Sequence, residues 1–283
     1  MALYLNRKKG GRSYARNQGI AKSKGQFIIF CDADFIVIPT FLKILEKYHT
    51  KHPDSVVSGI PNSWNMVFTQ YYPQFTLEQR SLLYHTLYDK GLWKNEYWGD
   101  ESQIKTLLTP KQLTEDFNKI EDFIFQEKVD ERTIKEYEET TYAPWLLFVT
   151  RCVSVKRRNL DKVGWFDERF KKYGLEDWEL GYRLHLEGVS FVSMRERVGY
   201  HQEHPKAQSE ADGNNENLKY MFEKFGFSDP ELNLFSFCPA YDNIALYKDH
   251  LRSLDKLKKK GKKKKYKNMN QEWKSLAKEF YYQ

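Results

Sequence analysis

The sequence lacks any apolar run that approaches the roughly 20 residues of a membrane-spanning helix. The stretch from Phe27 to Cys31, one of its longer apolar runs, has only the length of a strand. The N-terminus also lacks the order of a secretory signal, because the basic residues Arg7 to Lys9 follow the short apolar stretch and do not precede it. The sequence therefore predicts neither a spanning helix nor a signal peptide at this N-terminus.

Cysteine is scarce as well. The three cysteines, Cys31, Cys152 and Cys238, are scattered along the chain and odd in number. This pattern argues against a disulfide framework and indicates a reducing compartment, so we expect a cytoplasmic protein.

The body of the chain has no excess of positive charge. The formal net charge is +7, but the segment from Lys256 to the end holds 11 Lys and 2 Glu, or +9, which leaves −2 for the other 255 residues. The body is therefore not a basic nucleic-acid-binding domain, and we expect no specific nucleic acid partner. The lysine-rich tail lacks interleaved aromatic rings for base stacking. It is either a solvated, disordered tail or a surface that binds an anionic polymer or an anionic membrane.

What the chain does hold is enough apolar material for a core, since 40% of its residues are hydrophobic.

We divide the chain into four regions: 1–65, a mostly helical insertion over 66–142, 143–205, and a C-terminal extension over 206–283. The first and third regions have α/β character. In the first we predict a helix with apolar positions Ala15, Ile20 and Ala21 that ends at Gly25, a buried strand over Gln26–Cys31, a helix over Thr40–His52 and a strand over Val56–Ile60.

Signals of the same kind define the later regions. In the insertion, Thr109-Pro110 predicts a helix start, and apolar residues at 113, 117, 120, 123 and 124 predict that this helix continues. In the third region we predict a strand over Trp145–Val155, a turn over Gly164–Asp167, a helix over Glu176–Glu187 closed by Gly188, and a strand over Val189–Val192.

The first candidate site is Asp32-Ala33-Asp34, directly after the predicted buried strand. Ligands of open α/β sheets bind beyond the carboxyl ends of strands. Two carboxylates in this position suit Mg²⁺ or Mn²⁺, which prefer oxygen ligands and share them with substrate phosphates. The alternative is a solvated turn or a helix cap.

The second candidate is Tyr173-Gly174-Leu175-Glu176-Asp177-Trp178-Glu179. Acidic residues in a first helical turn are favoured by the helix dipole, which is the simpler explanation. Nearby aromatic residues, among them Trp165 and Phe166, argue for more, because sugars stack their apolar faces on aromatic rings. A carboxylate in such surroundings has a raised pKa and can act as a base.

Two further candidates are weaker. In Tyr200-His201-Gln202-Glu203-His204-Pro205, one imidazole could complete a metal site begun by Asp34, although a lone histidine is more often structural. Pro205 argues against a helix there, so the pair His201 and His204 is not interpreted as a zinc motif. The basic segment Gly11 to Gly19 could bind diphosphate oxygens through its guanidinium groups, or be a solvated loop.

The order and spacing of these motifs are more specific than each alone. Ala15-Arg16-Asn17-x-Gly19, followed by Gly25-x-Phe-Ile-Ile-Phe-x-Asp32-x-Asp34, resembles the middle of family 2 glycosyltransferases. Val163 to Phe170, Gly174 to Leu184 and Tyr200 to Glu203 resemble the catalytic end of the same GT-A, Rossmann-like fold. The likeness is to polymerising transferases of the bacterial chondroitin polymerase type and to C-terminal segments of galactosyltransferases, and it covers about residues 11–62 and 143–210.

The resemblance implies an inverting, metal-dependent transfer of a sugar from a nucleoside-diphosphate sugar to a hydroxyl of a carbohydrate, glycolipid or peptide acceptor, with Mn²⁺ or Mg²⁺ as cofactor. The residue roles that it implies are a metal site of Asp34 and His201; Asp32 near the donor ribose and metal; Asp177 as the base; Glu176 holding the acceptor; and Trp165 and Trp178 shaping the sugar pockets. From the residues themselves we add Arg12, Arg16 and Asn17 for the donor, and Tyr173 and Gly174 for the sugar.

One departure from the family stands out. Its members begin with βα units that hold the nucleotide base, whereas about ten residues precede the Ala-Arg-Asn segment here, and a parallel βαβ unit takes roughly 30. We therefore expect an N-terminally truncated GT-A core, either a fragment or a chain that another polypeptide completes. The outer edge of the Phe27–Cys31 strand would then be unpaired. The alternative function is an inactive remnant or partner subunit.

Overall fold

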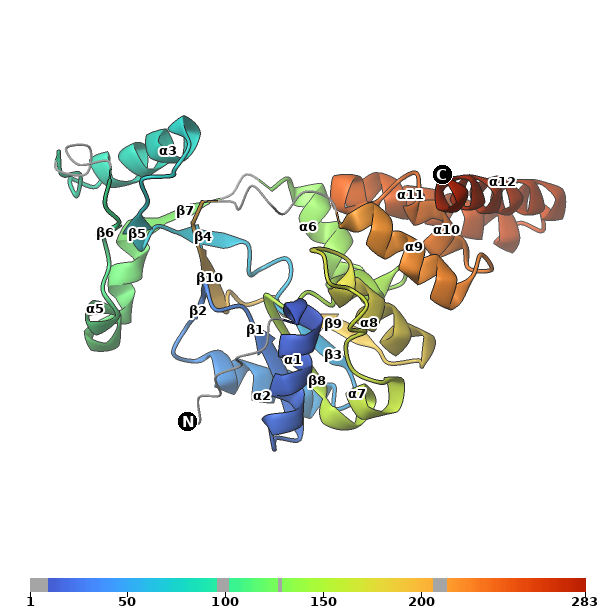
Figure 1. Ribbon diagram of the computed structural model, residues 1–283, viewed down its shortest axis with the longest axis horizontal. Helices are drawn as coiled ribbons and strands as arrows, with labels where there is room; N and C mark the ends of the chain where they lie inside the picture. Colours follow the sequence, from blue (N-terminus) through green and yellow to red (C-terminus); the bar gives the residue numbers. More distant parts are fainter. Residues whose placement is uncertain (1–9, 96–101, 127–128, 206–212) are drawn as a thin grey trace.

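The computed structural model describes residues 10–95, 102–126, 129–205 and 213–283. Within them, two four-stranded sheets, ordered β1-β8-β3-β9 and β2-β10-β4-β7, lie between helices (Figure 1). A two-stranded sheet joins β5 and β6. The strands are β1 Phe27–Cys31, β2 Phe35–Val37, β3 Val56–Ser58, β4 Asn65–Val67, β5 Gln70–Tyr71, β6 Lys105–Thr106, β7 Ile124–Gln126, β8 Cys152–Lys156, β9 Phe191–Ser193 and β10 Gly199–Gln202.

Helices surround these sheets. The α-helices are α1 Gly11–Lys22, α2 Phe41–Lys51, α3 Leu77–Tyr88, α5 Pro110–Glu115, α6 Glu131–Glu138, α7 Arg157–Val163, α8 Glu176–Leu186, α9 Asn214–Phe225, α10 Pro230–Phe235, α11 Ala240–Lys259 and α12 Lys263–Tyr282, and the 3₁₀ helices are η1 Phe117–Phe123 and η2 Pro144–Leu147. None of the helices in the described residues is long and apolar enough to cross a membrane.

The strand before the Asp-x-Asp motif is an edge strand. β1 pairs antiparallel with β8, and its other edge has no partner strand in the described part of the chain, as predicted. The expectation that this strand is buried was wrong in part. Ile28 and Phe30 face the core, but Ile29 and Cys31 are exposed, because only one face of β1 is covered.

The helix before β1 also differs from the prediction. α1 buries Ser13, Asn17 and Ile20, whereas Ala15 and Ala21 are exposed. The helix ends at Lys22 before an extended Ser23, so the glycine two residues later is not its cap. The buried face was missed because it is partly polar and its hydrogen-bond partners lie about 150 residues away in sequence.

The strand predicted over Trp145–Val155 is only partly a strand. Its first three residues belong to η2, residues 148–151 form a turn, and β8 begins at Cys152. Trp145, Leu146 and Leu147 are all buried, so this segment has no polar face to reveal its period. A fully buried apolar run cannot be assigned to helix or strand by periodicity.

The region 66–142 contains α3, α5, η1 and α6, but it is more than a helical excursion. β4 and β7 belong to the second sheet, and Met66 of β4 pairs with His201 of β10. The predicted boundary at residue 66 therefore cuts through a strand. The continuous helix predicted after Thr109-Pro110 was also wrong, since α5 ends at Glu115 and the extended Asp116 caps a separate 3₁₀ helix.

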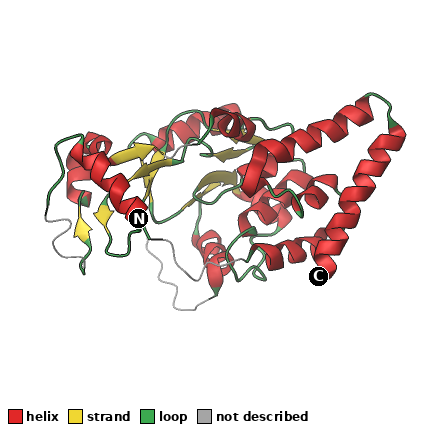
Figure 2. Ribbon diagram, turned by 90° about the horizontal axis from the view of Figure 1, so that it is seen from above, coloured by secondary structure: helices red, strands yellow, loops and turns green. Residues whose placement is uncertain are grey.

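The C-terminal extension is helical. From residue 213 onward it forms α9 to α12, and α11 and α12 make a long antiparallel hairpin at one end of the molecule (Figure 2). Trp273 and Ala277 bury their side chains against the core, and apolar residues at this spacing explain why α12 docks. This corrects the expectation that the tail is disordered: the lysine run forms the end of α11 and the start of α12, with its side chains exposed.

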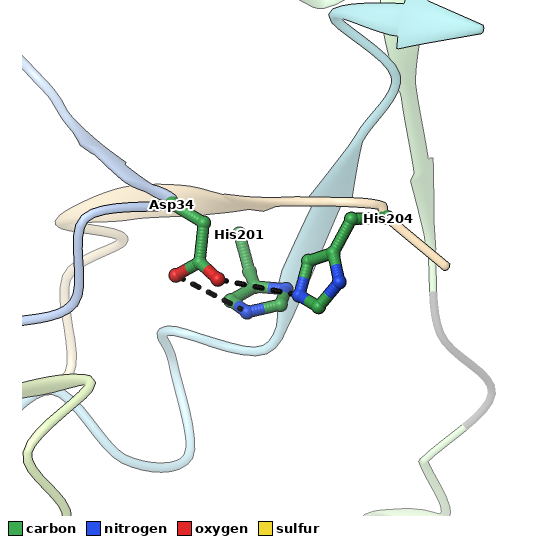
Figure 3. A group of neighbouring side chains, drawn as sticks. All are labelled: Asp34, His201 and His204. Carbon is green, nitrogen blue, oxygen red and sulfur yellow. Dashed lines mark ion pairs between the residues drawn. The ribbon is translucent and has the colours of Figure 1, made fainter. Parts of the chain in front are cut away.

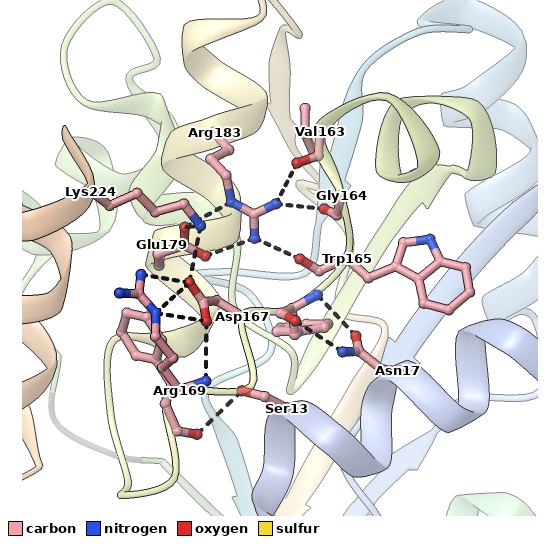
Figure 4. Close-up of polar contacts among 12 residues, drawn as sticks. Ser13, Asn17, Val163, Gly164, Trp165, Asp167, Arg169, Glu179, Arg183 and Lys224 are labelled. Carbon is pink, nitrogen blue, oxygen red and sulfur yellow. Dashed lines mark hydrogen bonds and ion pairs between the residues drawn. The ribbon is translucent and has the colours of Figure 1, made fainter.

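A buried ion-pair network holds α8 in place (Figure 4). Glu179 is fully buried and accepts two 2.7 Å hydrogen bonds from Arg183, and the Lys224 Nζ lies 2.7 Å from it. Arg183 also donates to the carbonyl oxygens of Val163, Gly164 and Trp165. The loop before α8 is therefore tied to the helix that carries the acidic motif.

Candidate active site

The turn that carries Asp32 and Asp34 links two different sheets. β1 of the first sheet ends at Cys31 and β2 of the second sheet starts at Phe35. β10 runs antiparallel to β2 with His201 opposite Phe35, and the Gln202 amide donates a 2.8 Å hydrogen bond to the Asp34 carbonyl. This register places a histidine beside the second aspartate of the motif.

Three side chains meet there (Figure 3). The Nε2 of His201 lies 3.6 Å from Oδ1 of Asp34, and the Nε2 of His204 lies 3.2 Å from its Oδ2. The predicted proximity of Asp34 and His201 is confirmed: their side chains are close enough to share one metal ion. His204, which follows the end of β10, is a third member that the prediction did not include.

The donor set and its unpaired atoms fit a divalent metal. One potential ligand atom from each of the three residues lies within 4.8 Å of the others. Two ligands bonded to one ion at 2.0–2.6 Å can be separated by up to about 5 Å. Asp34 Oδ1 and His201 Nδ1 are buried without a hydrogen-bond partner. Burial and the positive charge of Arg151 lower the pKa of His201 to about 4, so its imidazole is neutral at pH 7, the form that binds metals.

A second centre surrounds Arg16 of α1. Its guanidinium Nη1 donates to Oε1 of Glu176 at 2.8 Å and to Oδ1 of Asp177 at 3.0 Å, and its Nη2 lies 4.0 Å from Asp32. The other oxygen of Asp177 accepts hydrogen bonds from the amide and the hydroxyl of Thr150 at 2.9 and 2.8 Å. Arg16 therefore joins the Asp-x-Asp turn to the acidic motif of α8.

The electrostatics of this centre favour a carboxylate that can take up a proton near neutral pH. Burial raises the pKa of Asp177 to about 6, and the nearby Glu176 adds to the rise, while Arg16 and the Thr150 hydrogen bonds oppose it. Burial also raises the pKa of Asp32, again against the pull of Arg16. Such shifts at a cluster of acids are typical of functional sites.

The turn before α8 adopts a backbone that few residues tolerate. Gly174 has φ of 103°, and a Cβ there would lie 2.0 Å from the Asn214 side chain. Leu175, the N-cap of α8, has φ of 63°, a left-handed conformation that is costly for leucine. This turn lets the Gly174 amide donate to Glu176 at 3.1 Å, so both oxygens of Glu176 have partners within the protein.

The residues expected to bind the donor are placed differently from one another. Asn17 is buried, and its amide group donates to the Phe166 carbonyl and accepts from the Phe166 amide, each at 2.9 Å (Figure 4). The guanidinium of Arg12 lies over the Tyr173 ring at 4.2 Å from its centre. Asn17 thus fixes the loop against α1, whereas Arg12 and Tyr173 lie at the surface. Their roles in donor binding stay predictions.

The two tryptophans also differ. Trp178 donates from its indole to the Leu146 carbonyl at 3.0 Å and stacks on Tyr241, with ring centres 6.3 Å apart. Trp165 is half-buried and donates to Asp161 at 3.0 Å. Trp178 follows Asp177 directly in α8, so it lies next to the second centre. Neither contact tests a sugar-binding role.

Three residues of the site were missed. From the sequence, only a helix was considered as a means of placing His201 and His204 on one face. In the structure, the chain bends after β10 and brings the two imidazoles together. Thr150 and Arg151 lie between η2 and β8, where a continuous strand was predicted. The sequence gives no motif there, so only the fold reveals them.

Two family models match the chain. Glycosyl transferase family 2 matches residues 2–102, and glycosyltransferase like family 2 matches residues 108–275. The first match ends and the second begins within the region that we had interpreted as an insertion. Together they include the Asp-x-Asp turn, the acidic motif and β10.

Several curated proteins are similar. The uncharacterized glycosyltransferase YfnE of Bacillus subtilis is 31% identical over 218 residues, which are 76% of this chain and 54% of the relative. Chondroitin synthase of Escherichia coli is 26% identical over 70% of this chain and 26% of its own length. Validoxylamine A glucosyltransferase of Streptomyces hygroscopicus is 43% identical over 65 residues, or 23% of this chain and 15% of its own. The chain thus spans about half the length of the Bacillus relative and less of the others.

Proposed function

The chain belongs to glycosyltransferase family 2, and from this membership we propose that it transfers a sugar from a nucleoside-diphosphate donor to an acceptor hydroxyl, with inversion at the anomeric carbon. The observation that supports this best is that Arg16 connects the Asp-x-Asp turn to the acidic motif. Arg16 contacts Asp177 at 3.0 Å and reaches Asp32 of the Asp-x-Asp turn at 4.0 Å. The Asp-x-Asp turn and the acidic motif thus border one site, which supports a displacement between a bound diphosphate and a hydroxyl.

Asp34, His201 and His204 would hold the divalent cation of the reaction. Two imidazoles in the set favour Mn²⁺ over Mg²⁺, which prefers an all-oxygen shell. When bound, the cation offsets the negative charge that develops on the departing nucleoside diphosphate. The residues themselves would supply one carboxylate from the turn before β2 and two imidazoles from β10 and the segment that follows it, and they would leave the remaining positions to the donor.

Asp177 is the base in this proposal. Its carboxylate accepts the proton of the acceptor hydroxyl while the acceptor oxygen forms a bond to the anomeric carbon. The bond from that carbon to the diphosphate breaks, and its electron pair leaves with the nucleoside diphosphate. Thr150 holds one oxygen of Asp177, and Arg16 stabilises the charged form of the other, so the base keeps one orientation.

The other predicted contacts complete the proposal. Arg12 and Arg16 line the approach to the Asp-x-Asp turn and suit the oxygens of a diphosphate. Trp165, Trp178, Tyr173 and Gly174 border the acidic motif and would shape the sugar pockets. A hexosyl donor and a carbohydrate, glycolipid or peptide acceptor are part of the proposal. Three free cysteines suit a cytoplasmic location.

A donor assay tests this function. The full chain is incubated with a panel of uridine-, guanosine- and thymidine-diphosphate sugars in Mn²⁺, and release of nucleoside diphosphate is measured with and without a chelator. We expect release from at least one donor, and its loss when the metal is removed. If no donor is bound or cleaved, the alternative of an inactive remnant or partner subunit is correct for this chain.

A second function is favoured by the lysine run. Nine lysines between residues 256 and 267 are exposed on the α11–α12 hairpin, and Asp255, the acid beside them, pairs with Lys259 at 2.7 Å. We propose that this hairpin attaches to an anionic membrane surface, to which each lysine adds about 1 kcal/mol. Cosedimentation with phosphatidylglycerol vesicles should fall when Lys262 to Lys265 are changed to glutamine. Equal binding to phosphatidylcholine vesicles would contradict the proposal.

A further inference from the structure

A pocket of about 610 Å³ lies between α6, the start of α11 and the loop before β4. Its volume falls within the 300–1,000 Å³ typical of ligand sites. It is bordered by residues outside the motifs that led to the family. Its lining includes Trp64, Tyr137, Arg151, Tyr241, Asp242 and Asn243.

Two walls of the pocket are connected to Asp177, the proposed base, through neighbouring residues. Arg151, which lines it, follows Thr150, and Thr150 donates two hydrogen bonds to Asp177. Tyr241, on the other wall, stacks nearly parallel on Trp178, the residue after Asp177, with 11° between the rings. The pocket is therefore linked to Asp177 on two sides, through Thr150 and through Trp178.

The pocket also adjoins the metal centre. Arg151 lines the pocket and contacts the Asp-x-Asp turn through its backbone. The Asp32 amide donates to the Arg151 carbonyl at 3.3 Å, which ties the two backbones together. Arg151 thus lies where a donor and an acceptor would meet.

The lining chemistry suits a saccharide better than a lipid or an extended peptide. Trp64 and Tyr137 pack edge to face, with ring centres 4.9 Å apart, and with Tyr241 they give aromatic surfaces for the apolar faces of a sugar. Asp130, Arg132 and Asp242 add polar groups for hydroxyls. A lipid tail would have to pack against these charged groups and displace water from them. An extended peptide would need a free strand edge, whereas this pocket is bordered by helices and loops.

The start of α11 forms one edge of the pocket. Asn243 has φ of −158° and ψ of 90°, so its backbone is extended within the helix. The Leu246 amide donates a 2.9 Å hydrogen bond to the side-chain oxygen of Asn243. This kink carries Tyr241, Asp242 and Asn243 along one edge of the pocket.

We propose that this pocket is the acceptor site, and that it holds the terminal sugar of a saccharide acceptor with Tyr241 as a stacking surface. That the bound saccharide is an acceptor rests on the proposed function. Binding of a saccharide to this pocket does not, and it can be tested without turnover. It adds α6 and α11, from the insertion and the C-terminal extension, to the substrate-binding surface.

Saturation-transfer NMR on the full chain provides the test. The probe is a mixture of lactose, cellobiose, N,N′-diacetylchitobiose and the unsaturated chondroitin disaccharide. At least one sugar should bind the wild type. Tyr241→Ala should weaken that binding about three- to tenfold, the range expected for a lost aromatic contact, and Tyr241→Phe should restore it. Tyr282→Ala, which removes an exposed tyrosine at the end of α12, is the matched control and should have no effect.

The outcomes separate the two claims. Loss of donor cleavage with intact, Tyr241-dependent sugar binding would overturn the proposed function and leave a carbohydrate site. No binding of any disaccharide to the wild type, or binding that Tyr241→Ala leaves unchanged, would overturn the pocket. If Tyr241→Ala lowers the melting temperature, Asp242→Trp, which narrows the pocket at an exposed position, gives a second variant that should weaken binding.

Discussion

The two centres of the site differ in how far the protein satisfies its own polar atoms. Around Asp177 and Glu176, every carboxylate oxygen has a partner from Arg16, Thr150 or the Gly174 backbone. Around Asp34, one carboxylate oxygen and the Nδ1 of His201 are buried without a hydrogen bond. Buried polar atoms without partners are rare in folded proteins and call for an explanation.

This difference indicates two kinds of chemistry. The Asp34 centre is arranged to receive a ligand from outside, since its atoms converge and its imidazoles face the carboxylate. The Asp177 centre is arranged to hold a charge in place and to change its protonation. Variants of the two centres should therefore affect different properties.

The largest expected effect is on turnover. Asp177→Asn keeps the shape of the side chain but cannot accept a proton, so we expect turnover to fall by about 10²- to 10⁴-fold. Donor affinity should stay nearly unchanged, because the proposed metal ligands lie at the other centre and Arg16 is retained in this variant. Steady-state kinetics and donor titration measure the two effects separately. A loss below about tenfold would count against the base, and an equal loss of donor affinity would move Asp177 to the metal site.

The next effect concerns stability. Glu179 lies two residues after Asp177 but is fully buried between Arg183 and Lys224. Glu179→Gln removes the carboxylate that pairs with Arg183 and leaves Lys224 paired with Asp167, so it should lower the free energy of unfolding by about 3 to 5 kcal/mol. Glu131→Gln breaks an exposed pair with Lys135 and should change it by less than about 1 kcal/mol. Urea denaturation compares them, and similar losses would show that the buried network does not hold α8.

The smallest effect is a shift with pH. The pKa of Asp177 is raised to about 6, so its carboxylate is the charged form above pH 6 and is protonated below it. Turnover should therefore fall about tenfold per pH unit below pH 6, because the base is lost. Arg16 lowers this pKa, so Arg16→Met should move the acid limb to higher pH, and Arg16→Lys should move it less. A limb that stays in place in Arg16→Met would contradict the pairing.

The sequence could predict the parts of the fold that carry local signals. The edge strand, the helix over Thr40–His52 and the helix start at the acidic motif follow from apolar runs, spacing and glycines. The segment from Trp145 to Cys152 could not be assigned, because it is apolar on every side. The hairpin of the C-terminal extension was missed because its sequence is dominated by lysines. The apolar face by which α12 packs depends on few residues, among them Trp273 and Ala277.

The same division holds for the site. Asp34 and His201 could be paired in advance because a strand-end Asp-x-Asp and a late histidine match a family pattern. His204, Thr150 and Arg151 could not, since their positions depend on a bend after β10 and on the end of η2. Long-range contacts such as Arg16 with Asp177, 161 residues apart, are set by packing and not by spacing.

The most direct test of the account is the affinity of the full chain for Mn²⁺, measured by titration calorimetry. The wild type should bind one ion at the Asp34 centre. Asp34→Asn and His201→Ala should each weaken binding by at least about tenfold, while Asp177→Asn should bind as the wild type does. Wild-type affinity in Asp34→Asn, or a matching loss in Asp177→Asn, would contradict the division between a centre that binds the metal and a centre that moves the proton.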